Sequence, residues 1–129
     1  MGSKAADKKY RAMVKKRDPI RWRATKLRST SKDYSIEEYV EIIKTAGPCI
    51  YCSVPLDWRN ISLDHRVPTS RGGSNTKDNF QFVCKSCNRM KSSFMPDEYL
   101  KLLDVFPKGS EAFKLLMTKL KASNMMFGR

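Results

Sequence analysis

Four cysteines form two identical pairs, Cys49-x-x-Cys52 and Cys84-x-x-Cys87, with 31 residues between them. A turn of this kind presents two thiolates to one cation, and two such turns complete a tetrahedral site with Zn–S distances of about 2.3 Å. The alternatives are two disulfides or unrelated core cysteines. Because disulfides are rare in the cytoplasm, where we expect this chain, we favour zinc. Four sulfur ligands leave no position for water, so this zinc is expected to be structural, contributing on the order of 10 kcal/mol to folding.

The segment between the cysteine pairs contains the only histidine of the chain, His65, directly after Asp64. A neutral imidazole can take a proton from water, and a carboxylate is the type of ligand that Mg²⁺ or Mn²⁺ prefers. The alternative is a lone histidine that packs in a core or is exposed by chance. Strand alternation sends neighbouring residues to opposite faces, so the two side chains can share a site only where the strand bends or ends. In isolation the lone histidine is the better interpretation, but next to Asp64 and the four cysteines we favour a role for His65 as a base.

Further motifs surround this pair in a specific order. They are Leu63-Asp64-His65-Arg66-Val67-Pro68, Arg71-Gly72-Gly73-Ser74-Asn75, Asp78-Asn79-Phe80 and Cys87-Asn88-Arg89-Met90-Lys91. Together they resemble the HNH endonucleases, members of the His-Me finger (ββα-metal) nucleases, over about residues 47–95. The resemblance implies a metal-dependent endonuclease that hydrolyses DNA phosphodiester bonds and leaves 5′-phosphate and 3′-hydroxyl ends.

The resemblance also assigns catalytic roles to Asp64, His65, Asn79 and Asn88. His65 is expected to activate water, and Asp64 and Asn88 to hold the catalytic Mg²⁺ or Mn²⁺. Asn79 is expected to tie the loop after the first strand and to orient His65; its alternative is an ordinary turn asparagine. Relatives carry His or Asn at position 88, so this chain is a His-Asn-Asn variant. An amide oxygen suits a hard cation, which favours Mg²⁺ or Mn²⁺ over zinc for catalysis.

Positive charge is concentrated at the N-terminus, where residues 1–32 hold twelve basic and two acidic side chains, a net of +10 out of +13 for the chain. Neutralising phosphates releases counterions, so double-stranded DNA is the expected partner. The alternatives are a solvated tail or contact with an acidic membrane. Candidate phosphate contacts, each with a merely solvated charge as its alternative, are Arg21, Arg23, Lys26, Arg66, Arg71, Arg89 and Lys91.

The expected fold class is α+β: a small ββα-metal core, stapled by the four cysteines and flanked by helices. Residues 1–32 are expected to form a basic DNA-binding arm of one or two short helices, interrupted at Asp18-Pro19 and poorly anchored without DNA. Residues 33–129 form the expected nuclease domain. A capping box at Ser35 opens a helix that Gly47-Pro48 ends. Strand-like runs at 61–67 and 80–83 follow, and apolar stripes predict C-terminal helices within residues 96–123.

Several classes of protein are disfavoured. No apolar run approaches the ~20 residues that cross a bilayer, and no signal peptide is recognisable, so we expect a cytoplasmic protein without a membrane partner. Small HNH proteins resemble those of phages and mobile elements, which suggests such an origin, in a phage-infected host. A zinc-ribbon binding module without catalysis explains the cysteines and the charge but not Asp64, His65 and Asn88 together. An accessory nuclease of a larger machine, such as phage DNA packaging, is a third option. Sequence specificity, nicking against double-strand cutting, and monomer against transient dimer stay open.

Overall fold

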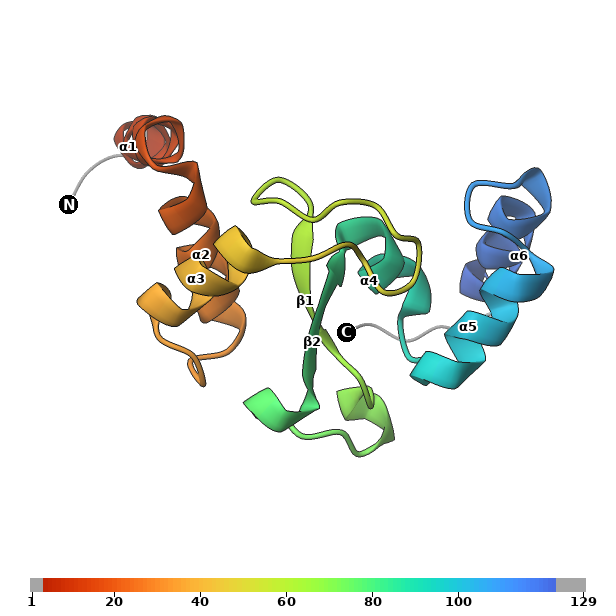
Figure 1. Ribbon diagram of the computed structural model, residues 1–129. Coiled ribbons are helices and arrows are strands. Elements are labelled where there is room, and N and C mark those ends of the chain that lie inside the picture. Colours follow the sequence, from red (N-terminus) through yellow and green to blue (C-terminus); the bar gives the residue numbers. More distant parts are fainter. Residues whose placement is uncertain (1–3, 123–129) are drawn as a thin grey trace.

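The computed structural model describes residues 4–122, which form six α-helices and one two-stranded sheet (Figure 1). The α+β class predicted from the sequence is confirmed. Residues 1–3 of the predicted arm and residue 123, the end of the predicted C-terminal helices, lie outside the described residues. The elements in chain order are α1 (Lys4–Arg17), α2 (Pro19–Thr30), α3 (Ile36–Thr45), β1 (Ile61–His65), the short 3-10 helices η1 (Thr69–Arg71) and η2 (Lys77–Asn79), β2 (Phe80–Cys84), α4 (Lys85–Lys91), α5 (Pro96–Val105) and α6 (Glu111–Ala122).

Local contacts fix the start of two helices, at the predicted Asp18-Pro19 interruption and at the predicted capping box. The Asp18 carboxylate accepts a hydrogen bond from the backbone of Arg21 (3.1 Å), and Pro19 occupies the first turn of α2. At α3 the backbone N–H of Ser35 donates to Glu38 (2.9 Å), and that of Glu38 donates to the Ser35 hydroxyl (3.1 Å). The predicted capping box is therefore confirmed.

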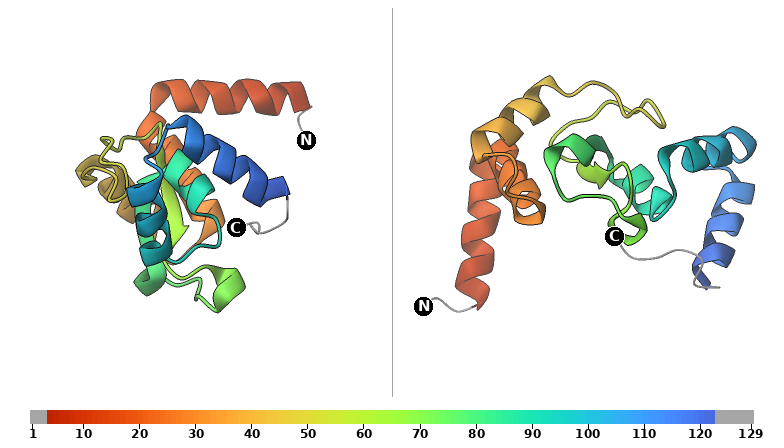
Figure 2. Two further views of the ribbon diagram at one scale, coloured as in Figure 1. Left: turned by 90° about the vertical axis from the view of Figure 1, so that its right-hand side faces the viewer. Right: turned by 90° about the horizontal axis from the view of Figure 1, so that it is seen from below.

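The expectation of a poorly anchored arm is wrong for α2. Ala24 and Leu27 are 0% and 5% exposed, in a core shared with Tyr39 of α3 and Ile61 of β1. The sparse apolar residues of α2 lie on one helical face, so they can be buried while its arginines and lysines stay outside. By contrast, α1 packs mainly against α2 and extends away from the sheet (Figure 2). The predicted boundary between the arm and the nuclease domain at residue 32 was based on charge, whereas the packing of side chains joins α2 to the sheet.

The sheet is a short antiparallel pair in which Ile61 lies opposite Cys84 and His65 lies opposite Phe80. Helix α4 starts directly after β2 and packs against both strands, which completes the ββα arrangement (Figure 1). A second core surrounds the cysteines and buries Tyr99 of α5 and Phe113 of α6. None of the described helices combines the length and the apolar character needed to span a bilayer.

Candidate active site and metal centre

The four cysteines converge on one point, with all Sγ atoms within 4.8 Å of one another. The Sγ atoms of Cys52 and Cys84 are 3.7 Å apart, which is too far for a disulfide and close to the ~3.8 Å edge of a tetrahedron with 2.3 Å metal–sulfur bonds. All four cysteines are free thiols. The alternatives of disulfides and scattered core cysteines therefore do not hold, and the cluster has the geometry of a four-thiolate metal site.

Two side chains from the C-terminal helices and their connection complete the surroundings of this cluster. The Lys108 ammonium lies 3.4 Å from Cys52 Sγ and 3.3 Å from Cys84 Sγ. Tyr99 is fully buried, and within the described residues its hydroxyl is the one buried side-chain polar atom without a hydrogen-bond partner. The Cys87 thiol affects this hydroxyl: burial and then Cys87 raise the pKa of Tyr99. A metal-bound thiolate at Cys87 would supply the missing acceptor.

The surroundings of the cluster shift the pKa values of two thiols in opposite directions. Burial raises the pKa of Cys84, but hydrogen bonds, including one from Lys108, outweigh it and lower the pKa to about 6. Burial raises the pKa of the Cys87 thiol, and the other cysteines add to this effect. Without a metal the cluster therefore favours a thiolate at Cys84 but not at Cys87. A bound divalent cation would displace the remaining protons, so its affinity falls as pH falls.

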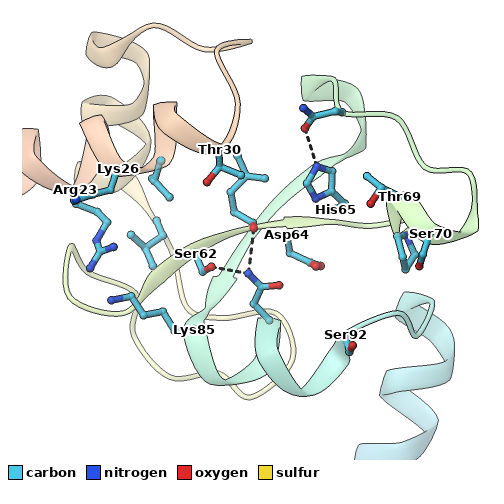
Figure 3. Close-up of a pocket in the computed structure, with 16 residues that line it drawn as sticks. Arg23, Lys26, Thr30, Ser62, Asp64, His65, Thr69, Ser70, Lys85 and Ser92 are labelled. Carbon is cyan, nitrogen blue, oxygen red and sulfur yellow. Dashed lines mark hydrogen bonds between the residues drawn. The ribbon is translucent and has the colours of Figure 1, made fainter. Parts of the chain in front are cut away.

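A cavity of about 530 Å³ lies along the free edge of β1, and all five residues of that strand line it (Figure 3). Within the described residues β1 pairs only with β2, so its other edge is open to this cavity. Asp64, His65 and Asn88 all line it. The cavity runs along the edge of the strand, where both faces are accessible. Strand alternation therefore does not separate Asp64 from His65.

The Asp64 carboxylate is nearly buried, with 5% of its side chain exposed, and two residues hold it from different elements. Gln81, opposite Asp64 in the sheet, donates from Nε2 to Asp64 Oδ2 (2.6 Å) and to the Tyr51 hydroxyl (2.7 Å). The Lys91 ammonium lies 3.3 Å from Asp64 Oδ2 and donates to the His65 carbonyl (3.0 Å). Tyr51 belongs to the first cysteine turn, so this network connects the four-cysteine cluster to Asp64. A carboxylate has about four lone-pair positions, which leaves some available for a cation.

We expect Lys91→Met to destabilise the fold by about 3–5 kcal/mol, because it leaves Asp64 as an uncompensated buried charge. The Lys91 side chain is 0% exposed, so no water replaces the lost ammonium. Urea unfolding of the metal-loaded protein measures the loss. The double variant Asp64→Asn/Lys91→Met should recover much of the lost stability. A double variant that loses as much stability as the two single variants together would show that the pair is not coupled.

Asn88 is oriented by two hydrogen bonds from its amide nitrogen. Nδ2 donates to the Ser62 hydroxyl (2.6 Å) and to the Leu63 carbonyl (3.1 Å). Because a backbone carbonyl only accepts, Nδ2 must face β1, and Oδ1 must point the other way. Asn88 therefore presents a fixed carbonyl oxygen. The Asn88 amide and the Asp64 carboxylate both carry hard oxygen atoms, the type of donor that Mg²⁺ or Mn²⁺ prefers.

His65 is held between Phe80 and Asn75. Its ring packs edge-on against Phe80 at a centroid distance of 5.3 Å, and its Nε2 lies 2.8 Å from Asn75 Oδ1. With the Asn75 oxygen as acceptor, Nε2 carries the proton and Nδ1 keeps the lone pair. The imidazole is thus arranged to accept a proton at Nδ1.

Asn79 ties together the loop between the strands. Its Oδ1 accepts from the backbone N–H of Val67 (3.0 Å), and its Nδ2 donates to the carbonyls of Val67 and Ser74 (both 2.9 Å). A Cβ at Gly73 would lie 1.7 Å from the Val67 carbonyl oxygen, so only glycine fits there. Asn75 belongs to this loop, and the Asn79 contacts therefore fix the partner of His65.

The predicted basic contacts are distributed unevenly. Arg23 and Lys26 line the cavity with Asp64, His65 and Asn88. The Arg71 guanidinium pairs with Glu98 of α5, and Lys91 is buried against Asp64, so neither faces the cavity as a free cation. The remaining candidates lie outside the cavity lining; they are Arg21, Arg66 and Arg89.

Sequence reasoning assigned no role to Gln81, Asn75, Lys85 and Lys108. Gln81 could have been found by pairing the two predicted strands, since it lies opposite Asp64. Asn75 belongs to the Gly-Gly-Ser-Asn motif but carried no distinguishing signal. Lys108 lies 24 residues beyond Cys84, and nothing in the local sequence connects it to the thiolates.

Comparison with known proteins identifies the segment that carries this site. Residues 49–94 match the family described as HNH endonuclease, which confirms the resemblance seen in the sequence. CRISPR-associated endonuclease Cas9 from Corynebacterium diphtheriae is 39% identical over 56 residues. This alignment covers 43% of the chain but only 5% of that protein. The chain therefore contains an HNH endonuclease segment, and α1 to α3, α5 and α6 lie outside the matched residues.

Proposed function

We propose that this protein is a metal-dependent endonuclease that hydrolyses phosphodiester bonds of double-stranded DNA. The observation that carries the proposal is that Asp64, His65 and Asn88 line one cavity in a segment that also contains the four-cysteine cluster. A binding module has no need for this combination. The HNH family match and the likeness to a Cas9 segment support a nuclease.

The proposed reaction begins with water in the cavity. His65 accepts a proton from this water at Nδ1, while Asn75 holds the protonated Nε2. The resulting hydroxide attacks phosphorus, the bond to the 3′ oxygen breaks, and that oxygen receives a proton from solvent. The products carry 5′-phosphate and 3′-hydroxyl ends. Asp64 and Asn88 would hold Mg²⁺ or Mn²⁺, which supplies positive charge for the phosphate and the departing oxygen.

The four cysteines are proposed to hold structural zinc. They leave no open position for substrate or water, so this metal shapes the fold while the exchangeable one serves catalysis. Asn79 is proposed to act through the loop that carries Asn75. A cytoplasmic, phage-related or mobile-element setting is proposed on the same resemblance.

Supercoiled plasmid is the substrate that tests this function. The protein, purified without chelator so that the cysteine site stays loaded, should nick or linearise the plasmid with added Mg²⁺ or Mn²⁺ and not without it. DNA ligase should reseal the nicks, because it requires 5′-phosphate and 3′-hydroxyl ends. No cleavage with either metal would contradict the nuclease, and cleaved ends that ligase cannot join would contradict the proposed bond polarity.

We expect deletion of residues 1–17 to weaken DNA binding and to flatten its dependence on salt. The deletion removes seven basic side chains and one acidic one, and each lost phosphate contact reduces the salt slope by about one. It stops at Arg17, because Ala24 and Leu27 of α2 belong to the core. Fluorescence anisotropy of a labelled duplex at several salt concentrations measures the slope. Tyr10→Ala/Met13→Ala is the matched control, since it changes α1 without changing its charge; an unchanged slope in the deletion would exclude α1 from binding.

A further inference from the structure

One wall of the cavity carries three cationic side chains. Arg23 and Lys26 come from α2, and Lys85 is the first residue of α4 (Figure 3). In the part of the chain that the structure describes, no carboxylate lies within ion-pair distance of any of them. The acidic residue of the cavity, Asp64, already pairs with Lys91. This wall therefore has an uncompensated positive charge.

The cations on α2 are held around one indole ring. Arg23 donates from Nε to the Trp58 carbonyl (2.8 Å), and its guanidinium lies 4.9 Å from the Trp22 ring centroid. Lys26 Nζ lies 5.6 Å from the same centroid, and Lys15 Nζ of α1 lies 4.6 Å from it. These contacts preorganise the charges, so an anion that binds them has less side-chain entropy to remove.

Lys85 belongs to the same positive field. It lines the same cavity as Arg23 and Lys26, although it comes from a different helix. Within the described residues no carboxylate pairs with any of the three, so their positive charge is available to an anionic ligand.

Lys85 and His65 lie at opposite ends of β1. The backbone N–H of Lys85 donates to the Asn60 carbonyl (2.8 Å), which places Lys85 beside the Ile61 end of the strand, whereas His65 is at the other end. At about 3.3 Å per residue the two ends of β1 are roughly 13 Å apart. A phosphate bound at Lys85 therefore lies a few nucleotides from the bond beside His65.

We propose that Arg23, Lys26 and Lys85 form a phosphate subsite that binds the backbone of the cleaved strand a few nucleotides from the scissile bond, with that strand lying along the free edge of β1. The proposal rests on the proposed nuclease function. Because α2 lies outside residues 49–94, two of the three cations are additions to the matched HNH segment. The N-terminal region thus forms part of the catalytic cavity as well as a basic arm.

The test measures binding separately from cleavage. All proteins carry His65→Ala, and the affinity for a labelled duplex is measured across salt concentrations. Lys26→Gln/Lys85→Gln should reduce the salt slope by about two, since each lysine neutralises one phosphate. The matched control, Lys44→Gln/Lys101→Gln, removes two exposed lysines of α3 and α5 that do not line the cavity, and it should change the slope less. Lysine acetylation with and without DNA, read by mass spectrometry, should show protection at Lys26 and Lys85 but not at Lys44 and Lys101.

The possible outcomes distinguish the subsite from the nuclease. Equal slopes in the two double variants, or acetylation of Lys26 and Lys85 at the same rate with and without DNA, would overturn the subsite even if the wild-type protein cuts plasmid. Protection and a reduced slope in a protein that cuts nothing would establish DNA phosphate contacts at Lys26 and Lys85 and overturn the proposed nuclease function, and with it the assignment of these contacts to a cleaved strand.

Discussion

Replacement of His65 by alanine is expected to lower the rate of plasmid cleavage by about 10²–10⁴-fold, the usual contribution of a general base. His65 is the only histidine of the chain, so no second imidazole can replace it. Its contacts to Phe80 and Asn75 do not involve the cysteines, and the fold should therefore be retained. The rate with Mg²⁺ at saturating DNA measures the effect.

Imidazole in the buffer is the sharpest control for this variant. The ring removed from position 65 leaves space beside Asn75, and free imidazole should restore part of the cleavage by His65→Ala. Metal content and DNA affinity should match the wild-type protein. Cleavage at the wild-type rate by the variant would remove His65 from the mechanism, and loss of zinc would show instead that the residue supports the fold.

Substitution of Cys87 by serine is expected to abolish zinc binding and to unfold residues around the cysteine cluster. The site contributes on the order of 10 kcal/mol when zinc is bound, which is comparable to the total stability of a small domain. Cys87 is fully buried with Val83, Tyr99 and Phe113, so its loss affects the β2–α4 junction and the C-terminal helices together. Metal analysis and thermal unfolding of the purified variant measure the two effects.

A graded control comes from the ammonium that contacts the thiolates. Lys108→Met should leave the four ligands in place and accelerate zinc release to a chromogenic chelator, because two negatively charged sulfurs lose their common donor. Lys114→Met, at an exposed position of α6, should release zinc at the wild-type rate. A stably folded Cys87→Ser protein that retains one zinc per chain would contradict the four-cysteine site.

The features that the sequence predicted are those encoded by spacing within short segments. Two Cys-x-x-Cys turns bring their own thiols together locally, and Ser35 with Glu38 caps α3 through contacts three residues apart. Asp64 and His65 are neighbours because they are consecutive in the chain. The order of the strands and of α4 follows from the same local signals, so the ββα core was predictable.

The remaining features depend on which surfaces meet. The sequence separated residues 1–32 from the rest by charge alone. In the structure Ala24 and Leu27 pack α2 against α3 and β1. Two apolar side chains are enough to anchor this helix, although its other faces are cationic. Lys91 looked like a phosphate contact, but one turn beyond Asn88 its ammonium reaches a buried carboxylate, where burial demands an opposite charge.

The Asp64-His65 pair shows the division most clearly. The sequence contains a carboxylate and an imidazole at neighbouring positions, and the alternation of side chains along a strand predicts that they point to opposite faces. Only the tertiary structure leaves one edge of β1 without a partner strand among residues 4–122. It places a cavity there, between α2 and α4, which residues from both faces of the strand line. Residue types and local spacing determined the available chemistry. The packing of distant helices decided where that chemistry meets a substrate, because burial and charge pairing depend on neighbours that are far away in the chain.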